Sequence, residues 1–293
     1  MTDFLEQVVA GIAAGGIYAS LALALVLIYQ AMGLINFAQG EFAMFSAFIC
    51  FTLLEVAQLP YALAFAISIL VAFVGAFAVE RIVVRPFERG SPLVVLIVTL
   101  ALFEIVNSVA GFIWGYQPRS FPSPFPARPI ALGSVLISIQ DLGIIGTALV
   151  ILGLLYLLFN HTKLGLAMRA AALYPEVSAL LGVRTGLMLG LGWGLASAVG
   201  AVSGILVAPV VLLEPNMMQG VIIYAFAAAV LGGIDSPLGA VVGGLALGVA
   251  LALIGAYLPT LADLRLALSL LLIVVLLVVR PTGLFGHHRA QRV

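Results

Sequence analysis

The sequence predicts an all-α integral membrane protein, a polytopic bundle of about eight or nine transmembrane helices with two broken or re-entrant segments. Hydrophobic residues make up 64% of its 293 residues and charged residues only 8%, against about 25% charged residues in an ordinary soluble domain. The mean hydropathy is +1.27. Because one helical crossing takes about 20 apolar residues, we expect a single transmembrane domain over residues 1–293 with little protein outside the lipid.

Seven apolar runs are about long enough to cross a membrane as helices. In chain order they are residues 8–29, 61–79, 92–113, 142–159, 187–213, 237–258 and 264–279. The last run has Arg265 at its outer end. The run at 92–113 contains Glu104 and Asn107, which lie three residues apart and therefore on one helix face. We expect this pair to form hydrogen bonds with another helix.

Basic residues in the connections predict the orientation, because Lys and Arg concentrate in short cytoplasmic loops. Three basic groups are expected inside: Arg81, Arg85 and Arg89; Lys163, Arg169 and Arg184; and Arg280, Arg289 and Arg292. The amino terminus and the Pro-rich loop 114–141 then lie outside, and the loop 160–186 lies inside. An outer amino terminus and an inner carboxyl terminus require an odd number of crossings. Nine satisfies this if the short segment 221–234 crosses, and a re-entrant segment there changes the count.

Pairs of glycines four residues apart predict where helix backbones approach closely in lipid. Such pairs are Gly11 and Gly15, Gly190 and Gly194, Gly200 and Gly204, Gly239 and Gly243, and Gly244 and Gly248. Since most of them follow residue 187, we expect a tightly packed carboxyl-terminal bundle.

Two segments, 33–40 and 232–239, share the pattern G-x-I-[ND]-x-x-x-G. Glycine and an Asn or Asp side chain support an unwound turn, and Pro237 suits the first turn of the next helix. One interpretation is a pair of helix breaks that flank a translocation path, since broken helices in a membrane line a cavity or are buried in protein. The other interpretation is two ordinary cytoplasmic turns, and the spacing alone favours neither.

The candidate path residues are polar and glycine residues from these two segments, together with the carboxylate that follows the first. They are Asn36, Gln39, Gly40, Glu41, Gly232, Gly233 and Asp235. An ionisable group inside a transmembrane segment is costly and is a candidate functional group by default. Glu41, just after the first segment, is therefore expected either to line or gate the path or to lie at the cytoplasmic headgroups.

The inward loop 160–186 carries a sequence typical of a short amphipathic helix. Pro175 and Glu176 suit a helix start, Val177, Leu180 and Leu181 repeat at helical spacing, and Gly182 suits a stop. A basic stretch at 165–169 that contains Arg169 precedes it. The helix could dock its apolar residues in a groove on a partner protein or lie on the membrane surface.

These segments carry a family resemblance. The sequence GLINFAQGE at 33–41, GLAMRA at 165–170, ALLGV at 179–183 and LGGIDSPLGA at 231–240 resemble the LivH-type permease subunits of branched-chain amino-acid ABC transporters. The resemblance spans nearly the whole chain. It implies a multi-pass subunit of the bacterial inner membrane that translocates branched-chain or related amino acids.

The resemblance also implies partners. They are a second, LivM-like permease subunit, two cytoplasmic ATPase subunits, a periplasmic solute-binding protein, an amino-acid substrate and membrane lipid. The segment 169–183 matches the one that docks on the ATPase in this family. The candidate coupling residues are Arg169, Glu176, Val177, Leu180, Leu181 and Gly182.

Motif and composition patterns restrict the other function classes. The sequence contains no G-x-x-x-x-G-K-[ST], so we expect no ATP site of its own and no enzyme activity. It also contains no H-E-x-x-H and no G-x-S-x-G, which leaves a membrane-embedded enzyme little support. A secondary transporter or channel that uses Glu41, Glu104 or Asp235 as a proton or cation site stays the alternative.

The charge balance and the few Cys and His residues argue against other ligands. The 12 Lys and Arg residues balance the 12 Asp and Glu residues and form no stripe that would bind nucleic acid. The single Cys50 excludes an internal disulfide and a Cys-based zinc site. His161 lies in a loop, and His287 and His288 lie in the basic tail. We therefore expect neither a metal site nor a cofactor.

Overall fold

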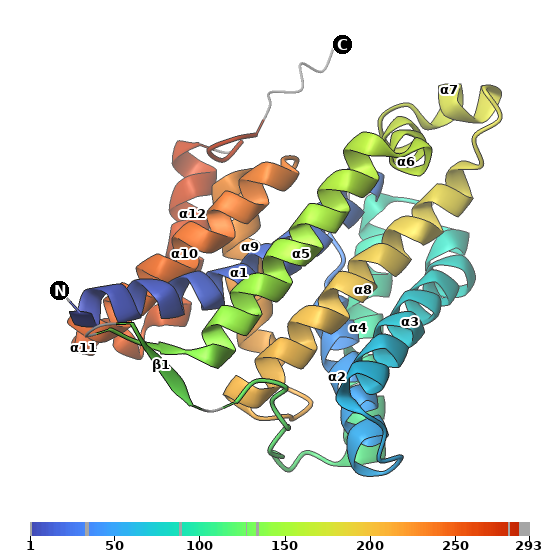
Figure 1. Ribbon diagram of the computed structural model, residues 1–293. Helices are drawn as coiled ribbons and strands as arrows, with labels where there is room; N and C mark the ends of the chain where they lie inside the picture. Colours follow the sequence, from blue (N-terminus) through green and yellow to red (C-terminus); the bar gives the residue numbers. More distant parts are fainter. Residues whose placement is uncertain are drawn as a thin grey trace. The chain divides into compact units, whose positions relative to one another are not determined.

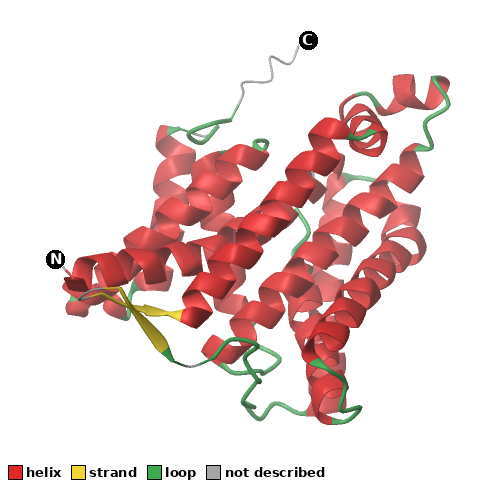
Figure 2. Ribbon diagram, viewed as in Figure 1, coloured by secondary structure: helices red, strands yellow, loops and turns green. Residues whose placement is uncertain are grey.

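The computed structural model describes residues 2–32, 35–87, 90–126, 128–132, 135–280 and 282–286, and helices dominate it (Figures 1 and 2). The long helices are α1 (Thr2–Met32), α2 (Gln39–Glu55), α3 (Tyr61–Val79), α4 (Pro92–Trp114), α5 (Ile139–His161), α8 (Thr185–Val211), α9 (Met218–Gly232), α10 (Pro237–Tyr257) and α12 (Arg265–Val279). Short helices are α6 (Lys163–Leu173), α7 (Pro175–Leu180) and α11 (Pro259–Ala262). Each predicted crossing run coincides with one of the long helices.

The membrane class is confirmed by helix length and hydropathy. Six helices of the described chain are long and apolar enough to cross a membrane, and they correspond to α1, α3, α4, α5, α8 and α10. The helix of α3 continues through a π-helical turn at Glu80–Val84 and a 3-10 turn at Arg85–Phe87. Two shorter apolar helices, α9 and α12, have 15 residues each. The helix α2 has 17 residues and contains the carboxylates of Glu41 and Glu55.

The connection between α4 and α5 contains a β-hairpin that the sequence analysis did not predict. The strands β1 (Pro129–Leu132) and β2 (Val135–Ser138) pair antiparallel, with Ile130 opposite Ile137. Glu6 of α1 accepts a hydrogen bond from the backbone N–H of Leu136 at 2.7 Å. Strands of only four residues offer too few alternating positions to be predicted from the sequence, and the nearby prolines are typical of a loop.

The chain forms two compact units, which we describe separately. One unit comprises Met1–Val26, Phe125–Leu149 and Gly220–Val293, and the other comprises Leu27–Pro124 and Val150–Gln219. We call them the first and the second unit. Some residues that the sequence analysis named lie outside the described residues. They are Gly33 and Leu34 of the first break, Arg89, and the tail residues His287, His288, Arg289 and Arg292.

In the first unit, the predicted glycine pairs lie where helices touch. A Cβ atom added at Gly15 of α1 would come within 2.8 Å of the carbonyl oxygen of Gly244 on α10. One added at Gly11 would come within 2.7 Å of the Cα atom of Val249. Gly243 of α10 packs in the same way against the backbone of α9 at Ala228. Larger side chains would push these backbones apart, so glycine allows the close packing.

In the second unit, the glycines of α8 face two neighbouring helices. Gly190 and Gly194 pack against the rings of Phe77 and Phe73 on α3, while Gly200 and Gly204 pack against α2. The close packing predicted at these pairs is thus confirmed, but the expected single carboxyl-terminal bundle is wrong, because α8 and α10 belong to different units and pack on α2 and α3 and on α1, respectively. The helix α8 contacts α3 through its first glycine pair and α2 through its second. It is therefore the central helix of this unit.

Candidate functional site

The interruption between α1 and α2 is organised by Asn36. Its side-chain Oδ1 accepts a hydrogen bond from the backbone N–H of Ala38 at 3.0 Å, which forms an Asx turn. The helix α2 then begins at Gln39, and Gly40 and Glu41 lie buried in its first turn. The predicted first break is therefore a short irregular segment that ends in a new helix, with its polar side chains turned into the protein.

Gln39 places this segment beside the middle of α8. Its Nε2 donates a hydrogen bond to the backbone carbonyl oxygen of Ala196 at 2.8 Å. A Cβ atom at Gly200 would lie only 2.6 Å from that Nε2, so the glycine leaves the space that the amide occupies. Ala196 and Gly200 lie near the centre of α8, a helix long and apolar enough to cross the membrane. The first break therefore lies beside the middle of α8 rather than beside either of its ends.

Asn107 joins α4 to Glu41 of α2 and to the connection before α9. The Nδ2 of Asn107 on α4 lies 3.2 Å from the Oε2 of Glu41. It also lies 3.0 Å from the carbonyl oxygen of Pro215 and 3.2 Å from the Oδ1 of Asn216. Interhelical hydrogen bonding is thus confirmed for Asn107. Its partner in the prediction, Glu104, is exposed one turn earlier on α4 and lies within electrostatic range of Glu41.

Several polar atoms around this break are buried without a hydrogen-bond partner among the described residues. They are the Nδ2 of Asn36, the Oε1 of Gln39, the Oε1 of Glu41 and the Oγ of Ser197. Buried polar atoms in proteins are nearly always paired with protein, water or a ligand. All four belong to the second unit, on α2, on α8 and in the segment that precedes α2. We call Asn36, Gln39, Glu41, Asn107 and Ser197 the polar break cluster.

The second predicted segment is a tight turn in the first unit. α9 ends at Gly232 and α10 begins at Pro237, and the Oγ of Ser236 caps α10 by accepting from the N–H of Gly239 at 3.1 Å. Gly233 has a φ of 108°, which favours glycine. The segment 282–286 covers this turn, because the N–H groups of Leu284 and Phe285 donate to the carbonyls of Leu231 and Gly232, both at 2.9 Å.

The second segment therefore interrupts the helices, as its G-x-I-[ND]-x-x-x-G pattern predicted. Its surroundings differ from those of the first segment. A Cβ atom at Gly233 would lie 2.6 Å from the backbone nitrogen of Gly286, and one at Gly286 would lie 2.9 Å from the Oδ1 of Asp235. Backbone fills the space around this turn, whereas side-chain amides and a carboxylate surround the first break.

The loop 160–186 contains two helices, α6 and α7, where the sequence predicted one short helix. Thr162 caps α6, since its Oγ1 accepts from the N–H of Gly165 at 3.0 Å. The basic stretch with Arg169, for which no structure was predicted, is therefore helical. Its i to i+3 and i+4 pattern is short and lacks charge contrast, which is why the helix was missed.

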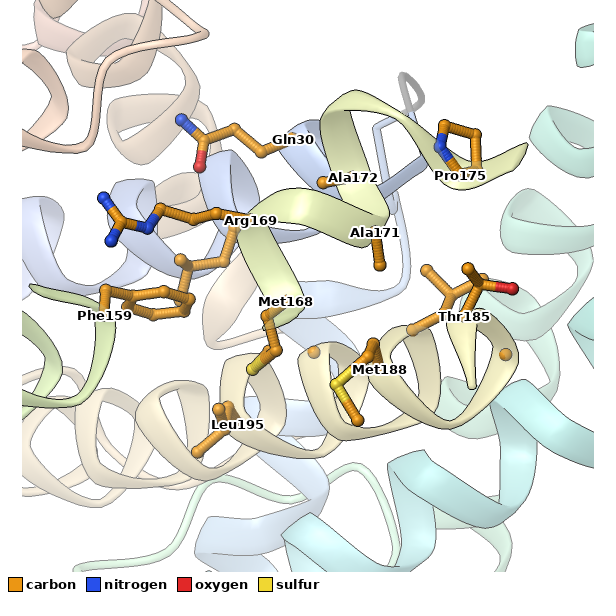
Figure 3. Close-up of a pocket in the computed structure, with 14 residues that line it drawn as sticks. Gln30, Phe159, Met168, Arg169, Ala171, Ala172, Pro175, Thr185, Met188 and Leu195 are labelled. Carbon is orange, nitrogen blue, oxygen red and sulfur yellow. The ribbon is translucent and has the colours of Figure 1, made fainter. Parts of the chain in front are cut away.

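The helix α6 packs against α8, while α7 leaves its large apolar side chains exposed. Met168 of α6 is buried and lies with Met188 and Leu195 of α8 around a cavity of about 170 Å³ (Figure 3). Arg169 and Gln30 border the same cavity. On α7, Leu180 is 87% exposed and the following Leu181 is 80% exposed, and Gly182 ends the helix with a φ of 86°. The predicted helix start, apolar repeat and stop are confirmed as local structure.

Three polar residues of the second unit were missed by sequence reasoning. Ser197 and Asn216 carried no local signal, because their neighbours in space come from other helices. Glu80 is only 1% exposed and packs beside Gly190 of α8. Its position next to Arg81 suggested a hydrated loop, but the helix of α3 runs on through it to Phe87.

Comparison with known proteins gives a consistent set of similarities. Residues 7–279 match the family described as the permease component of branched-chain amino acid transport systems. The chain is 30% identical over 306 residues to the high-affinity branched-chain amino acid transport system permease protein LivH of Escherichia coli strain K12, covering 99% of this chain and 98% of that protein.

Two other relatives extend this similarity. The permease protein BraD of Pseudomonas aeruginosa, also named for high-affinity branched-chain amino acid transport, is 32% identical over 312 residues and covers 99% of this chain and 98% of its own length. A probable LivH permease of Methanocaldococcus jannaschii is 28% identical over 278 residues, covering 91% and 87%. The similarity thus runs through both units and both interrupted segments.

Proposed function

Because this chain belongs to the family of permease components of branched-chain amino acid transport systems, we propose that it carries branched-chain or related amino acids inward as one subunit of an ATP-driven importer. The resemblance that the motifs predicted is confirmed by the family match. The substrate class comes from relatives named for branched-chain amino acid transport. The chain is a multi-pass membrane protein, and we assign it to the bacterial inner membrane.

The polar break cluster supports the proposal that the path passes the interruption before α2. An α-amino acid needs partners for an ammonium and a carboxylate. The carboxylate of Glu41 suits an ammonium, while N–H groups at the start of α2 suit a carboxylate. Asn36, Gln39 and Gly40 would shape this part of the path, and Glu41 would supply its charge.

Gly232, Gly233 and Asp235 remain in the proposed path because they share the pattern of the first break. Their backbone is covered by the segment 282–286. We therefore propose that they contribute less polar contact to the substrate than Glu41 and Gln39 do.

We propose that α7 and its flanking residues couple the chain to an ATPase subunit. A cluster of exposed large apolar side chains marks an interaction surface. Leu180 and Leu181, which are almost fully exposed, and the half-exposed Val177 form one in this loop. Glu176 lies in the first turn of α7, and Gly182 ends it. Arg169 on α6, near the Oδ1 of Asn160 at 3.5 Å, would transmit movement of the loop toward α5.

The remaining partners follow from the same family. We propose a second, related permease subunit, two cytoplasmic ATPases and a periplasmic binding protein that delivers the amino acid. Since the sequence holds no P-loop pattern, the ATP would be bound by another polypeptide. Membrane lipid covers the apolar helix faces.

Reconstitution of the purified chain tests the class of transporter. Vesicles that contain this chain alone should take up no leucine under a proton or sodium gradient. Vesicles that also contain the second permease, the ATPases and the binding protein should take it up when ATP is supplied. Gradient-driven uptake by the chain alone would instead identify a secondary transporter that uses an intramembrane carboxylate, and would overturn the proposal.

A further inference from the structure

A second polar cavity, remote in sequence from the polar break cluster, lies within the first unit among α1, α9, α10 and α12. Its volume is about 430 Å³, within the range of roughly 300–1,000 Å³ that small-molecule sites occupy. The polar side chains around it are Gln7, Tyr18, Tyr224 and Arg265. No acidic side chain lines it among the described residues.

Arg265 supplies a positive charge that the described residues leave unmatched. Its Nε is buried and has no hydrogen-bond partner among them. Arg265 is the first residue of α12, and the preceding Leu264 provides no side-chain cap. A cation is unfavourable at a helix N-terminus, because the helix dipole is positive there. The position therefore does not stabilise the helix, and it concentrates positive potential on the cavity.

Two tyrosines complete the donor set. The rings of Tyr18 on α1 and Tyr224 on α9 lie 5.1 Å apart between centroids, and the charge of Arg265 interacts electrostatically with both phenol groups. Phenol O–H groups, the amide of Gln7 and the guanidinium all donate hydrogen bonds. A group of hydrogen-bond donors that includes a cation and no carboxylate suits an anionic ligand. A guanidinium group binds a carboxylate with paired hydrogen bonds.

Gly255 of α10 makes room for the guanidinium. A Cβ atom at this position would overlap Arg265, with its Cζ at 2.5 Å and its Nε at 2.9 Å. The remaining walls are small or aliphatic side chains, namely Ala10, Ala14, Leu251, Ala252 and Ala256. The cavity thus combines an anion-binding end with apolar walls that suit an aliphatic side chain.

We propose that this cavity binds the carboxylate of an aliphatic amino acid at the outer face of the chain, with Arg265 as the anchor and Tyr18 and Tyr224 as further donors. The inference rests on the proposed function and on the orientation that the basic loops predict. It adds a site at the amino-terminal end of α12, where substrate delivered from outside would first meet the chain. A lipid phosphate has related chemistry, and the experiment distinguishes it.

The test measures binding to the full chain in nanodiscs of zwitterionic phosphatidylcholine. Leucine and isovalerate both carry a carboxylate, whereas leucinol carries a hydroxyl in its place. The site predicts that leucine and isovalerate bind and that leucinol binds about tenfold more weakly, the factor expected for one charge-assisted hydrogen-bonded contact. Arg265→Gln should abolish this difference, while Arg128→Gln, a change of an exposed arginine in the connection to β1, should leave it intact.

A second variant keeps the charge and adds one methyl group. Gly255→Ala favours the helix but should displace the guanidinium and weaken leucine binding by about tenfold, on the same reasoning. Unchanged leucine binding in both Gly255→Ala and Arg265→Gln would overturn the site. So would an effect of Arg265→Gln only on retained phosphatidylglycerol, which would assign the cavity to lipid.

The uptake experiment separates this site from the proposed function. If the complete transporter with Arg265→Gln takes up leucine with an unchanged half-saturating concentration, the carboxylate site is wrong and the permease function stands. If the unaltered complete transporter takes up no branched-chain amino acid, the proposed function itself fails.

Discussion

Asn107 and Glu41 are 66 positions apart in sequence, yet the Nδ2 of Asn107 donates to the Oε2 of Glu41 at 3.2 Å. The same Nδ2 also reaches the carbonyl oxygen of Pro215 at 3.0 Å. One amide therefore joins the start of α2, the carboxyl-terminal half of α4 and the connection between α8 and α9. As a donor, it fixes the carboxylate of Glu41 within the polar break cluster.

Replacing Asn107 by leucine should destabilise the second unit. The substitution preserves the size of the side chain but leaves the Oε2 of Glu41 without this donor, and an unsatisfied buried polar group costs about 1–3 kcal/mol. Denaturant unfolding of the purified chain should show a free energy of unfolding lower by that amount. Ser108→Ala, at the exposed neighbouring position, is the control, and equal stability of both variants would refute the role of Asn107.

A valine at position 204 should separate α2 from α8. Its Cβ would overlap the carbonyl group of Ala43, and overpacking of a tight contact costs about 1–3 kcal/mol. Gly153→Val is the matched control, because a Cβ atom there meets nothing within 4 Å. We expect a lower thermal midpoint for Gly204→Val than for Gly153→Val. The close packing would be contradicted by equal midpoints.

An arginine at position 180 should weaken assembly with the ATPase. Leu180 is 87% exposed, and the loss of one central apolar contact in an interface costs enough for about a tenfold drop in affinity. Co-purification of the ATPase with the chain measures this, with membrane insertion checked separately. Leu166→Arg is the control, since Leu166 is 61% exposed on α6 of the same loop. Undiminished ATPase recovery with Leu180→Arg would remove α7 from the interface.

Alanine at position 233 should destabilise the first unit. Gly233 has a φ of 108° and touches the backbone of Gly286, and a non-glycine residue in such a conformation costs about 1–3 kcal/mol. Gly220→Ala is the control, because the nearest atom to a Cβ there is a Leu266 methyl group at 3.9 Å. Hydrogen exchange at Leu284 and Phe285 should accelerate in Gly233→Ala alone. Slow exchange in both variants would show that the turn tolerates a side chain.

Helices and their close contacts were predictable because local patterns encode them. Apolar length places the crossing helices, and glycine spacing marks the faces on which α1 meets α10 and α8 meets α2 and α3. The start and stop of α7 also follow from Pro175 and Gly182, whose backbone preferences act locally.

The arrangement around the first break was not predictable in the same way. The partners of Glu41 and Gln39 are Asn107 and the carbonyl of Ala196, which come from distant helices. A single sequence carries no signal for such pairings. It also does not indicate whether the break lies beside the middle or the end of a neighbouring helix. Similarly, the shared pattern of the two segments did not reveal that residues 282–286 cover the second.

Uptake by the complete transporter with Glu41→Ala tests the central claim most directly. The control is Glu55→Ala, which changes an exposed carboxylate at the other end of the same helix. If the path passes the polar break cluster, Glu41→Ala should lower ATP-dependent leucine uptake by about tenfold or more, the loss of one charged contact, while ATPase co-purification stays normal. Leucine uptake equal to that of Glu55→Ala, at equal amounts of assembled transporter, would contradict the account.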